Sequence, residues 1–90
     1  MAILVVNHDY PTAGNLIAVD DDTGLPIEGV TIRIYASDAD PATDDEWVAA
    51  TFTDPEGKWL EPVYLPEEFT WQVAFEKPTM YPLKVVEITT

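Results

Sequence analysis

Regular alternation of apolar and polar residues along most of the chain is the feature that most limits its fold. Val30, Ile32 and Ile34 occupy every second position of one segment, for example, and the residues between them are mostly polar. Successive side chains of a β-strand point to opposite faces, so a period of two predicts strands with one buried face. No segment carries a capped apolar repeat of 3.6 residues, and eight prolines among 90 residues disfavour long helices. The chain is therefore predicted to be all-β.

Turn residues separate the alternating segments at intervals typical of a sandwich or barrel. Seven strands are predicted, over residues 2–7, 15–19, 29–36, 47–53, 59–65, 69–75 and 83–89. Pro62 is expected to bend or interrupt the segment 59–65, because proline cannot donate to a β-ladder. Strands this short are not stable alone. The prediction is one domain, residues 1–90, in which two antiparallel sheets bury alternate residues against each other.

The alternation also assigns side chains to faces. In the segment 29–36, Val30, Ile32 and Ile34 share one face, and Tyr35 lies with Thr31 and Arg33 on the other. Leu16 and Ala18 share one face of the segment 15–19, and Ile17 and Val19 share the other. The predicted core positions of the segment 69–75 are Phe69, Trp71, Val73 and Phe75.

The charge balance excludes several classes of partner. Seventeen acidic and four basic residues give a net charge of −13, and four scattered cations cannot form a patch for nucleic acid or an anionic membrane. A high-salt origin, in which ions screen the self-repulsion, and an ordinary acidic surface are equally compatible with this balance. The absence of cysteine excludes disulfides, thiolate metal sites and cysteine nucleophiles. No apolar run is long enough for a membrane span, and no export signal is visible at residues 1–6.

Two turn motifs occur in order, and each has a structural explanation. In the first, a glycine supplies the positive φ of a tight turn, a proline stiffens the approach to the next strand, and a second glycine permits a bulge. In the second, an aspartate accepts bonds from the amides of a type I turn closed by glycine. The residues of the two motifs are Thr23, Gly24, Pro26, Gly29, Thr53, Asp54 and Gly57.

The two motifs together resemble those of carboxypeptidase-regulatory-like domains, and they are similar to those of Cna-B and prealbumin-like sandwiches. The resemblance covers about residues 14–65. It implies an immunoglobulin-like or prealbumin-like sandwich and says almost nothing about activity. Residues 65–71 lack the glycine of the family's L-x-P-G-x-Y turn, so this turn must differ. Some Cna-B relatives carry an internal amide bond from a lysine in the first strand. The first strand here has no lysine, and only an inverted pair of Lys84 with Asn7 would supply such a bond.

No set of residues with hydrolytic spacing is visible. The single His8 lies beside Asp9, but Ser37, the only serine, belongs to a separate polar segment. A base needs a nucleophile within hydrogen-bond reach. Transthyretin-like hydrolases need several His and Arg residues, which His8 alone does not provide. We therefore expect a protein that is not an enzyme.

Calcium is the only cofactor with candidate ligands. Asp38, Asp40 and Asp44 lie in a loop with five acidic side chains, and Asp38-x-Asp40 is similar to the start of an EF-hand loop. However, Thr43 stands where that loop needs glycine, and Ala49 stands where it needs glutamate. A solvated acidic loop is the favoured interpretation, and we expect no cofactor.

These features predict a structural or binding module, most simply a virion component of a tailed virus of bacteria or archaea, as a capsid decoration or tail-associated protein. Its expected partners are capsid or tail proteins, and the first strand is a candidate for docking or strand addition. The alternative is a spacer or carbohydrate-binding module of a surface adhesin, pilin or secreted enzyme, located outside the cell. Candidate interaction residues are Ile3, Leu4, Val5, Tyr10, Met80 and Tyr81.

Overall fold

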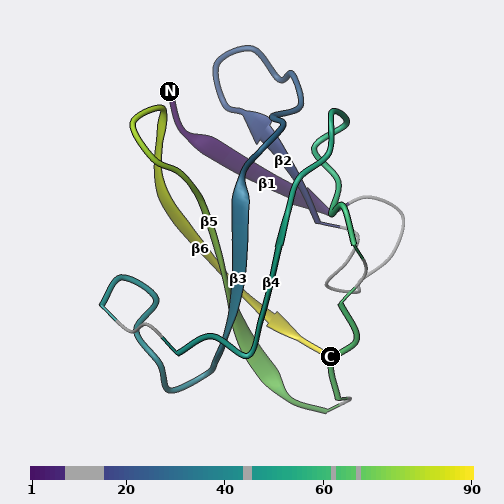
Figure 1. Ribbon diagram of the computed structural model, residues 1–90, viewed down its shortest axis with the longest axis vertical. Coiled ribbons are helices and arrows are strands. Elements are labelled where there is room, and N and C mark those ends of the chain that lie inside the picture. The colour runs from purple at the N-terminus through teal and green to yellow at the C-terminus, as the bar shows by residue number, and fades with distance from the viewer. Residues whose placement is uncertain (8–15, 44–45, 62, 67) are drawn as a thin grey trace.

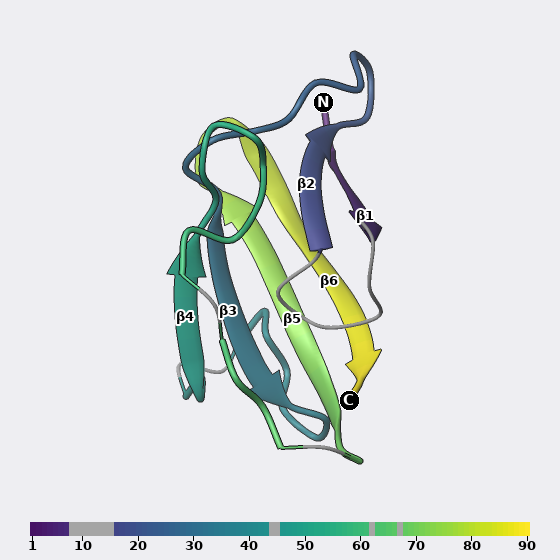
Figure 2. The same ribbon diagram turned by 90° about the vertical axis from the view of Figure 1, so that its right-hand side faces the viewer.

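The strands of the protein form two antiparallel sheets that lie against each other as layers (Figures 1 and 2). The computed structural model describes residues 1–7, 16–43, 46–61, 63–66 and 68–90. The smaller sheet pairs β1 with β2, and the larger sheet has the order β4-β3-β5-β6. The strands are β1 (Ile3–Asn7), β2 (Leu16–Asp20), β3 (Thr31–Ala36), β4 (Ala49–Phe52), β5 (Thr70–Lys77) and β6 (Tyr81–Thr89). The predicted all-β architecture of two antiparallel sheets is confirmed.

The described residues contain six strands and no helix, so they contain no helix that could cross a membrane. The segment 59–65 differs from its prediction, because its described residues form only an isolated bridge between Trp59 and Thr53. The Leu60 amide donates to the Phe52 carbonyl at 2.8 Å, which places the start of this segment along the end of β4. Pro62, which carries no N–H to continue a ladder, lies outside the described residues. The count of seven strands and the immunoglobulin-like type stay predictions.

The core lies between the two sheets. Val30, Ile32 and Ile34 are completely buried, which confirms that they share the inner face of their segment. Ile32 lies opposite Phe75 in the register of β3 and β5, and Ile34 lies opposite Val73. The smaller sheet contributes a further set of buried residues, which are Ile3, Leu16 and Ala18. Burial of each large apolar side chain contributes roughly 1.5–3 kcal/mol, so this layer is the main source of stability.

Phe69 departs from the predicted core, and Trp71 lies at its edge, packed against the buried residues. Phe69 precedes β5 and is largely exposed, so its prediction as a core residue is wrong. Trp71 is only half-buried, and its ring lies 6.1 Å from that of Phe69. The alternation of apolar residues continues to the start of the segment 69–75, but the smaller sheet does not extend far enough to cover the side chains there (Figure 2).

Tyr35 is buried on the outer face of the larger sheet, where alternation predicted it with Arg33. The segment after β3 folds back over this face. The Gln72 side-chain amide on β5 donates to the carbonyls of Ser37, at 3.0 Å, and Ala39, at 2.5 Å. Pro41 then lines the same hollow as Tyr35. A polar loop thus covers part of a sheet face that sequence alone would leave in solvent.

Thr53 connects the two motifs identified in the sequence. Its buried hydroxyl donates to the Ile27 carbonyl at 2.7 Å and accepts from the Val30 amide at 2.9 Å. Its backbone amide donates to the Val30 carbonyl, and its carbonyl accepts from the Gly29 amide. One residue therefore satisfies four of the backbone groups where the chain bends from residue 27 into β3.

Gly57 connects the second motif to the smaller sheet. Its carbonyl accepts from the Ala18 amide at 3.0 Å, and the Ala18 carbonyl accepts from the Ile27 amide at 3.0 Å. Val19 bridges Pro26 in the same region. The edge of β2 that faces away from β1 is therefore occupied by the two motifs rather than by a strand.

Replacement of Gly57 by alanine should destabilise the protein far more than replacement of Gly24. Both glycines have positive φ, 76° and 72°, so an added Cβ costs about 1 kcal/mol at either position. At Gly57 that Cβ would also lie 2.5 Å from the Ala18 carbonyl oxygen, whereas no described atom lies within 4 Å at Gly24. The backbone clash should add about 2 kcal/mol or more. Urea denaturation of both variants measures the difference, and equal losses would contradict the contact.

Thr53→Val should lower the free energy of unfolding by about 1–3 kcal/mol. The methyl group keeps the shape but leaves the Val30 amide and the Ile27 carbonyl without their partner. Thr51→Val is the matched control, because Thr51 is also buried but only accepts one long bond of 3.4 Å from the Glu61 amide. The free energy of unfolding of the control, measured by urea denaturation, should fall much less. An equal fall in both variants would show that the loss of any buried hydroxyl, rather than of the bonds at the bend, lowers the stability.

Candidate binding surface

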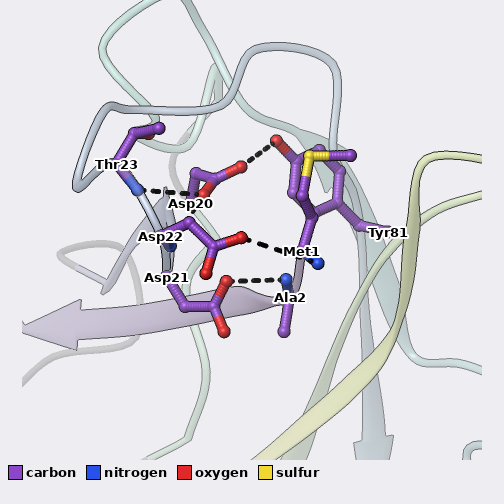
Figure 3. Close-up of polar contacts among 7 residues, drawn as sticks. All are labelled: Met1, Ala2, Asp20, Asp21, Asp22, Thr23 and Tyr81. Atoms are coloured by element: carbon purple, nitrogen blue, oxygen red, sulfur yellow. Dashed lines mark hydrogen bonds and ion pairs between the residues drawn. The ribbon is translucent and has the colours of Figure 1, made fainter.

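An acidic turn follows β2, and its first residue is nearly buried. Asp20 is 6% exposed, and its Oδ1 accepts from the backbone amides of Asp22, at 2.8 Å, and Thr23, at 3.2 Å. Its Oδ2 accepts from the Tyr81 hydroxyl on β6 at 2.7 Å (Figure 3). Aspartate commonly caps a turn in this way. The turn thereby joins the end of β2 to the start of β6.

The bond between Asp20 and Tyr81 shifts the pKa of both groups in opposite directions. The Tyr81 hydroxyl, followed by the turn amide of Asp22, stabilises the charged carboxylate and lowers the pKa of Asp20, although burial opposes this shift. The same bond, together with burial and the neighbouring carboxylates, raises the pKa of Tyr81. The pair is therefore a charged acceptor and a neutral donor through the neutral pH range.

The other two carboxylates of the turn have partners at the beginning of the chain. Asp21 Oδ1 accepts from the Ala2 amide at 2.8 Å, and Asp22 Oδ2 lies 3.7 Å from the α-amino group of Met1 (Figure 3). Among the described residues, Asp20, Asp21 and Asp22 form the one group of three whose carboxylate oxygens lie close enough to share a metal ion. Each of these carboxylates already has a partner within the protein. Their role is therefore explained by the bonds that hold the turn to the start of the chain and to β6.

The predicted calcium candidates form no comparable group within the described part of the chain. Asp40 Oδ1 accepts from the Ala42 amide at 3.0 Å, and the Asp40 carbonyl accepts from the Thr43 amide. Asp38 is exposed two residues earlier, and Asp44 lies outside the described residues. The carboxylate of Asp40 therefore caps a turn of its own loop.

Met80 and Tyr81 lie in a groove of about 550 Å³ at one end of the sandwich, whereas Tyr10 lies outside the described residues. Leu25 and Pro26 also line this groove. Lys77 lines it as well, and its ammonium donates to the Glu28 carbonyl at 2.8 Å. The sequence predicted Met80 and Tyr81 as binding candidates but gave no sign that Leu25 and Pro26, more than fifty positions earlier, would lie beside them.

The predicted candidates of the first strand lie on different faces of it. Ile3 is buried and Val5 is half-buried against the core, whereas Leu4 is 47% exposed on the outer face. Val6 is 38% exposed on that same outer face, and the register places Leu4 opposite Val19 and Val6 opposite Ile17. We call this outer apolar surface the ribbon face, and its residues are Leu4, Val6, Ile17 and Val19.

The backbone of β1 has an unpaired edge. The Asp21 amide donates to the Ala2 carbonyl, whereas the amides of Ala18 and Asp20 point the other way, to Gly57 and Leu25. Pairing in an antiparallel ladder alternates, so the backbone groups of residues 3 and 5 point away from β2. The described residues place no further strand in this sheet. We call this row of groups the β1 edge.

Acidic residues border the ribbon face. The turn 54–58 lies beside Ile17, because a Cβ added to Gly57 would stand 3.1 Å from the Ile17 Cγ2 atom. That turn carries Asp54 and Glu56, and its cation Lys58 is 3.2 Å from Glu56. The acidic turn after β2 adds two exposed carboxylates at the end of the ribbon. The border is therefore net negative, whereas the surface itself carries no charge.

Ile17 and Val19 were not singled out from the sequence, although a signal was present. Ile3 to Val6 is an uninterrupted apolar run, and both faces of the segment 15–19 are apolar. Such runs indicate strands covered on both faces. Among the described residues, only the inner of the two faces is fully covered.

The candidate hydrolytic residues are not brought together in the described structure. Ser37 is exposed, and its carbonyl accepts from Gln72, whereas His8 lies outside the described residues. No family model matches the chain, and searches of curated proteins and of solved structures also found no match.

Tyr81→Phe should lower the melting temperature most between about pH 5 and pH 9. A lowered carboxyl pKa stabilises the fold above its ordinary value near 4, and this contribution is lost as the pH falls through the folded pKa of Asp20. A raised tyrosine pKa stabilises the fold below about 10, and this contribution is lost as the pH rises through the folded pKa of Tyr81. Calorimetry across pH 2–11 tests both limits. Tyr64→Phe is the control, because Tyr64 is 89% exposed. A difference between wild type and Tyr81→Phe that did not vary with pH would contradict the assignment.

Proposed function

We propose that the protein is a non-enzymatic structural module that attaches to a protein partner in a larger assembly through the ribbon face. The observation that supports this proposal is that the β1–β2 sheet is apolar on both faces. Its inner face packs on the larger sheet, and its outer face stays exposed. Antiparallel sheets with one covered face normally carry polar residues on the other.

The outer face of the larger sheet provides a contrast within the same molecule. Thr31, Arg33 and Glu76 lie there, and the loop after β3 covers part of the surface. That face mixes polar residues with the exposed aromatic Phe52, whereas the ribbon face carries apolar side chains alone. Contiguous apolar surface rimmed by polar residues is typical of protein interaction sites.

The non-enzymatic part of the proposal rests on the residue types available. The chain has one histidine, one serine and no cysteine. The carboxylates of the acidic turn take part in bonds that hold the turn and the strands together. A nucleophile with an adjacent base is the minimum for covalent hydrolysis, and the described residues do not bring such a pair together.

The proposed setting is a virion, where the module would decorate a capsid or associate with a tail. A net charge of −13 suits a protein displayed to solvent, including concentrated salt. The proposed fold type is the prealbumin-like sandwich of carboxypeptidase-regulatory-like domains. The alternative setting is the cell surface, where the module would be a spacer within an adhesin, pilin or secreted enzyme.

Carbohydrate binding is the second candidate function, and one observation favours it. Trp47 and Phe52 are exposed aromatic residues next to Arg33 and Thr31 on the outer face of the larger sheet. Flat aromatic rings of this kind can stack on sugars. The Arg33 guanidinium already lies 4.7 Å from the centre of the Trp47 ring, which leaves one face of the ring for a ligand. The ribbon face is apolar throughout, so it carries the main proposal.

Val6→Asp should release the protein from its assembly, whereas Val85→Asp should not. The two valines are matched, because they are 38% and 37% exposed and lie on strands β1 and β6. A carboxylate buried without a partner in an interface costs several kcal/mol, so the ratio of free to assembled protein should rise at least tenfold. The measurement is sedimentation of each variant, expressed from the native locus, in gradients that separate virus particles, cell envelope and free protein.

Two outcomes of this experiment contradict the proposal. Val6→Asp could remain assembled like wild type, which would exclude the ribbon face as the attachment surface. Val85→Asp could be released equally, which would show that any added acid disturbs assembly. The fraction in which the wild type sediments separates the two settings, because a particle fraction supports the virion and an envelope fraction supports the cell surface.

A further inference from the structure

A hollow on the outer face of the larger sheet is bordered by four polar side chains. Thr31, Arg33 and Tyr35 come from β3, and Glu76 comes from β5. The volume of the hollow is about 140 Å³, and Pro41, from the loop after β3, also lines it. None of the four polar side chains has a hydrogen bond or an ion pair with another described residue. We call this site the outer hollow.

Tyr35 is the most buried of these side chains, since it is only 1% exposed. Polar groups placed this deeply normally have a hydrogen-bond partner. In the described part of the chain, the fully enclosed polar side-chain atoms that lack a partner are the indole nitrogens of Trp59 and Trp71. The Tyr35 oxygen is not one of these atoms, so it is accessible from the hollow that the side chain lines. A molecule bound there would supply the bond that the protein does not.

Arg33 and Glu76 carry opposite charges that do not pair with each other. In the register of β3 and β5, Arg33 lies opposite Ala74, two positions before Glu76, and side chains in this diagonal relation are roughly 7–8 Å apart. The Arg33 guanidinium lies instead over the Trp47 ring, 4.7 Å from its centre. This contact leaves the N–H groups that point away from the ring free to donate. A cation and an anion are therefore both available at the outer hollow.

Hydrogen bonds within the protein hold the wall of the outer hollow in place. The Gln72 side chain donates to the Ala39 carbonyl, and Asp40 Oδ1 accepts from the Ala42 amide at 3.0 Å. Ala74, which lines the hollow from β5, is only 4% exposed although it lies on the outer face of the sheet. The site is therefore shaped before a ligand arrives, which lowers the conformational entropy lost on binding.

Size and charge together select the class of ligand. The volume is well below the roughly 300–1,000 Å³ of pockets for drug-sized molecules, so it suits one small molecule. An anion would be repelled by Glu76 and by the net charge of −13, and a simple cation would lie beside Arg33. A zwitterion has no net charge and can pair with both groups. Leu83 and Pro41 provide apolar surface for a short side chain.

We propose that the outer hollow binds a free amino acid. The carboxylate of the ligand accepts from the Arg33 guanidinium and the Tyr35 hydroxyl, and its ammonium donates to the Glu76 carboxylate. Hydrogen bonds between charged groups are the stronger ones, and two of opposite sign fix the orientation of the ligand. The inference goes beyond the proposed function, because the outer hollow and the ribbon face lie on the outer faces of different sheets.

Titration of the full chain with each free protein amino acid at neutral pH, followed by amide NMR, tests the inference. The amides of Arg33, Ala74 and Glu76 should shift with a dissociation constant of about 1 mM or lower, whereas those of Val6 and Ile17 should not shift. The tightest ligand is then compared with its N-acetyl form, which lacks the ammonium, and with its carboxamide, which lacks the carboxylate. Each should bind at least tenfold more weakly than the free amino acid.

Three variants test the assigned contacts. Glu76→Gln should weaken binding of the amino acid at least tenfold, whereas Glu87→Gln, an exposed position of β6 outside the hollow, should leave it unchanged. Tyr35→Phe should also weaken binding, but the melting temperature without ligand should stay the same, because the hydroxyl has no partner in the described chain. A purely structural hydroxyl would instead lower that temperature. If Tyr35→Phe does not fold, the comparison of Glu76→Gln with Glu87→Gln still decides the question.

Several outcomes would overturn the inference. One is that no amino acid binds at concentrations up to about 10 mM, and another is that the shifted amides lie away from the outer hollow. Equal binding of the N-acetyl form, or of a neutral sugar such as glucose at the same amides, would show that two opposite charges are not what the site recognises. None of these results bears on the ribbon face, because attachment is measured separately by the release of Val6→Asp from its assembly.

Discussion

The hydrogen bonds that join Thr53, Ile27 and Ala18 hold the two sheets of this protein together. No strand of the smaller sheet pairs with a strand of the larger one. The connection is made by the bend after residue 27, which the Thr53 hydroxyl fixes to the end of β4, by Gly57, which accepts from β2, and by the bond from Tyr81 on β6 to Asp20. Because these contacts set the position of β2, they also determine which face of the β1–β2 sheet is buried and which is left exposed.

Much of the fold could be predicted because the responsible signals are local. Alternation placed Ile32 and Ile34 on the buried face, and the turn motifs separated strands that the structure contains. What alternation cannot show is how far the opposite layer extends or what folds back over an outer face. Phe69 is exposed beyond the reach of the smaller sheet, and Tyr35 is buried by a loop held by Gln72. Both outcomes depend on contacts between segments far apart in the sequence.

The candidate surface was predictable only in part, for the same reason. The first strand stood out as apolar and uncharged, which identified Leu4, but its two faces could not be told apart without knowing what covers them. Asp20 and Tyr81 are 61 positions apart, and no local pattern links them. Only the structure shows that each acidic residue of this turn has a partner within the chain.

The central place of β5 in the larger sheet has a consequence for synthesis on the ribosome. The strand order is β4-β3-β5-β6, so β3 has only a short partner until β5 has been made. Val73 and Phe75, which close the core, also belong to β5. The first two-thirds of the chain thus emerge with no complete core to bury β1 and β2. Productive folding has to wait for nearly the whole polypeptide, and the nascent chain exposes both faces of an apolar hairpin until then.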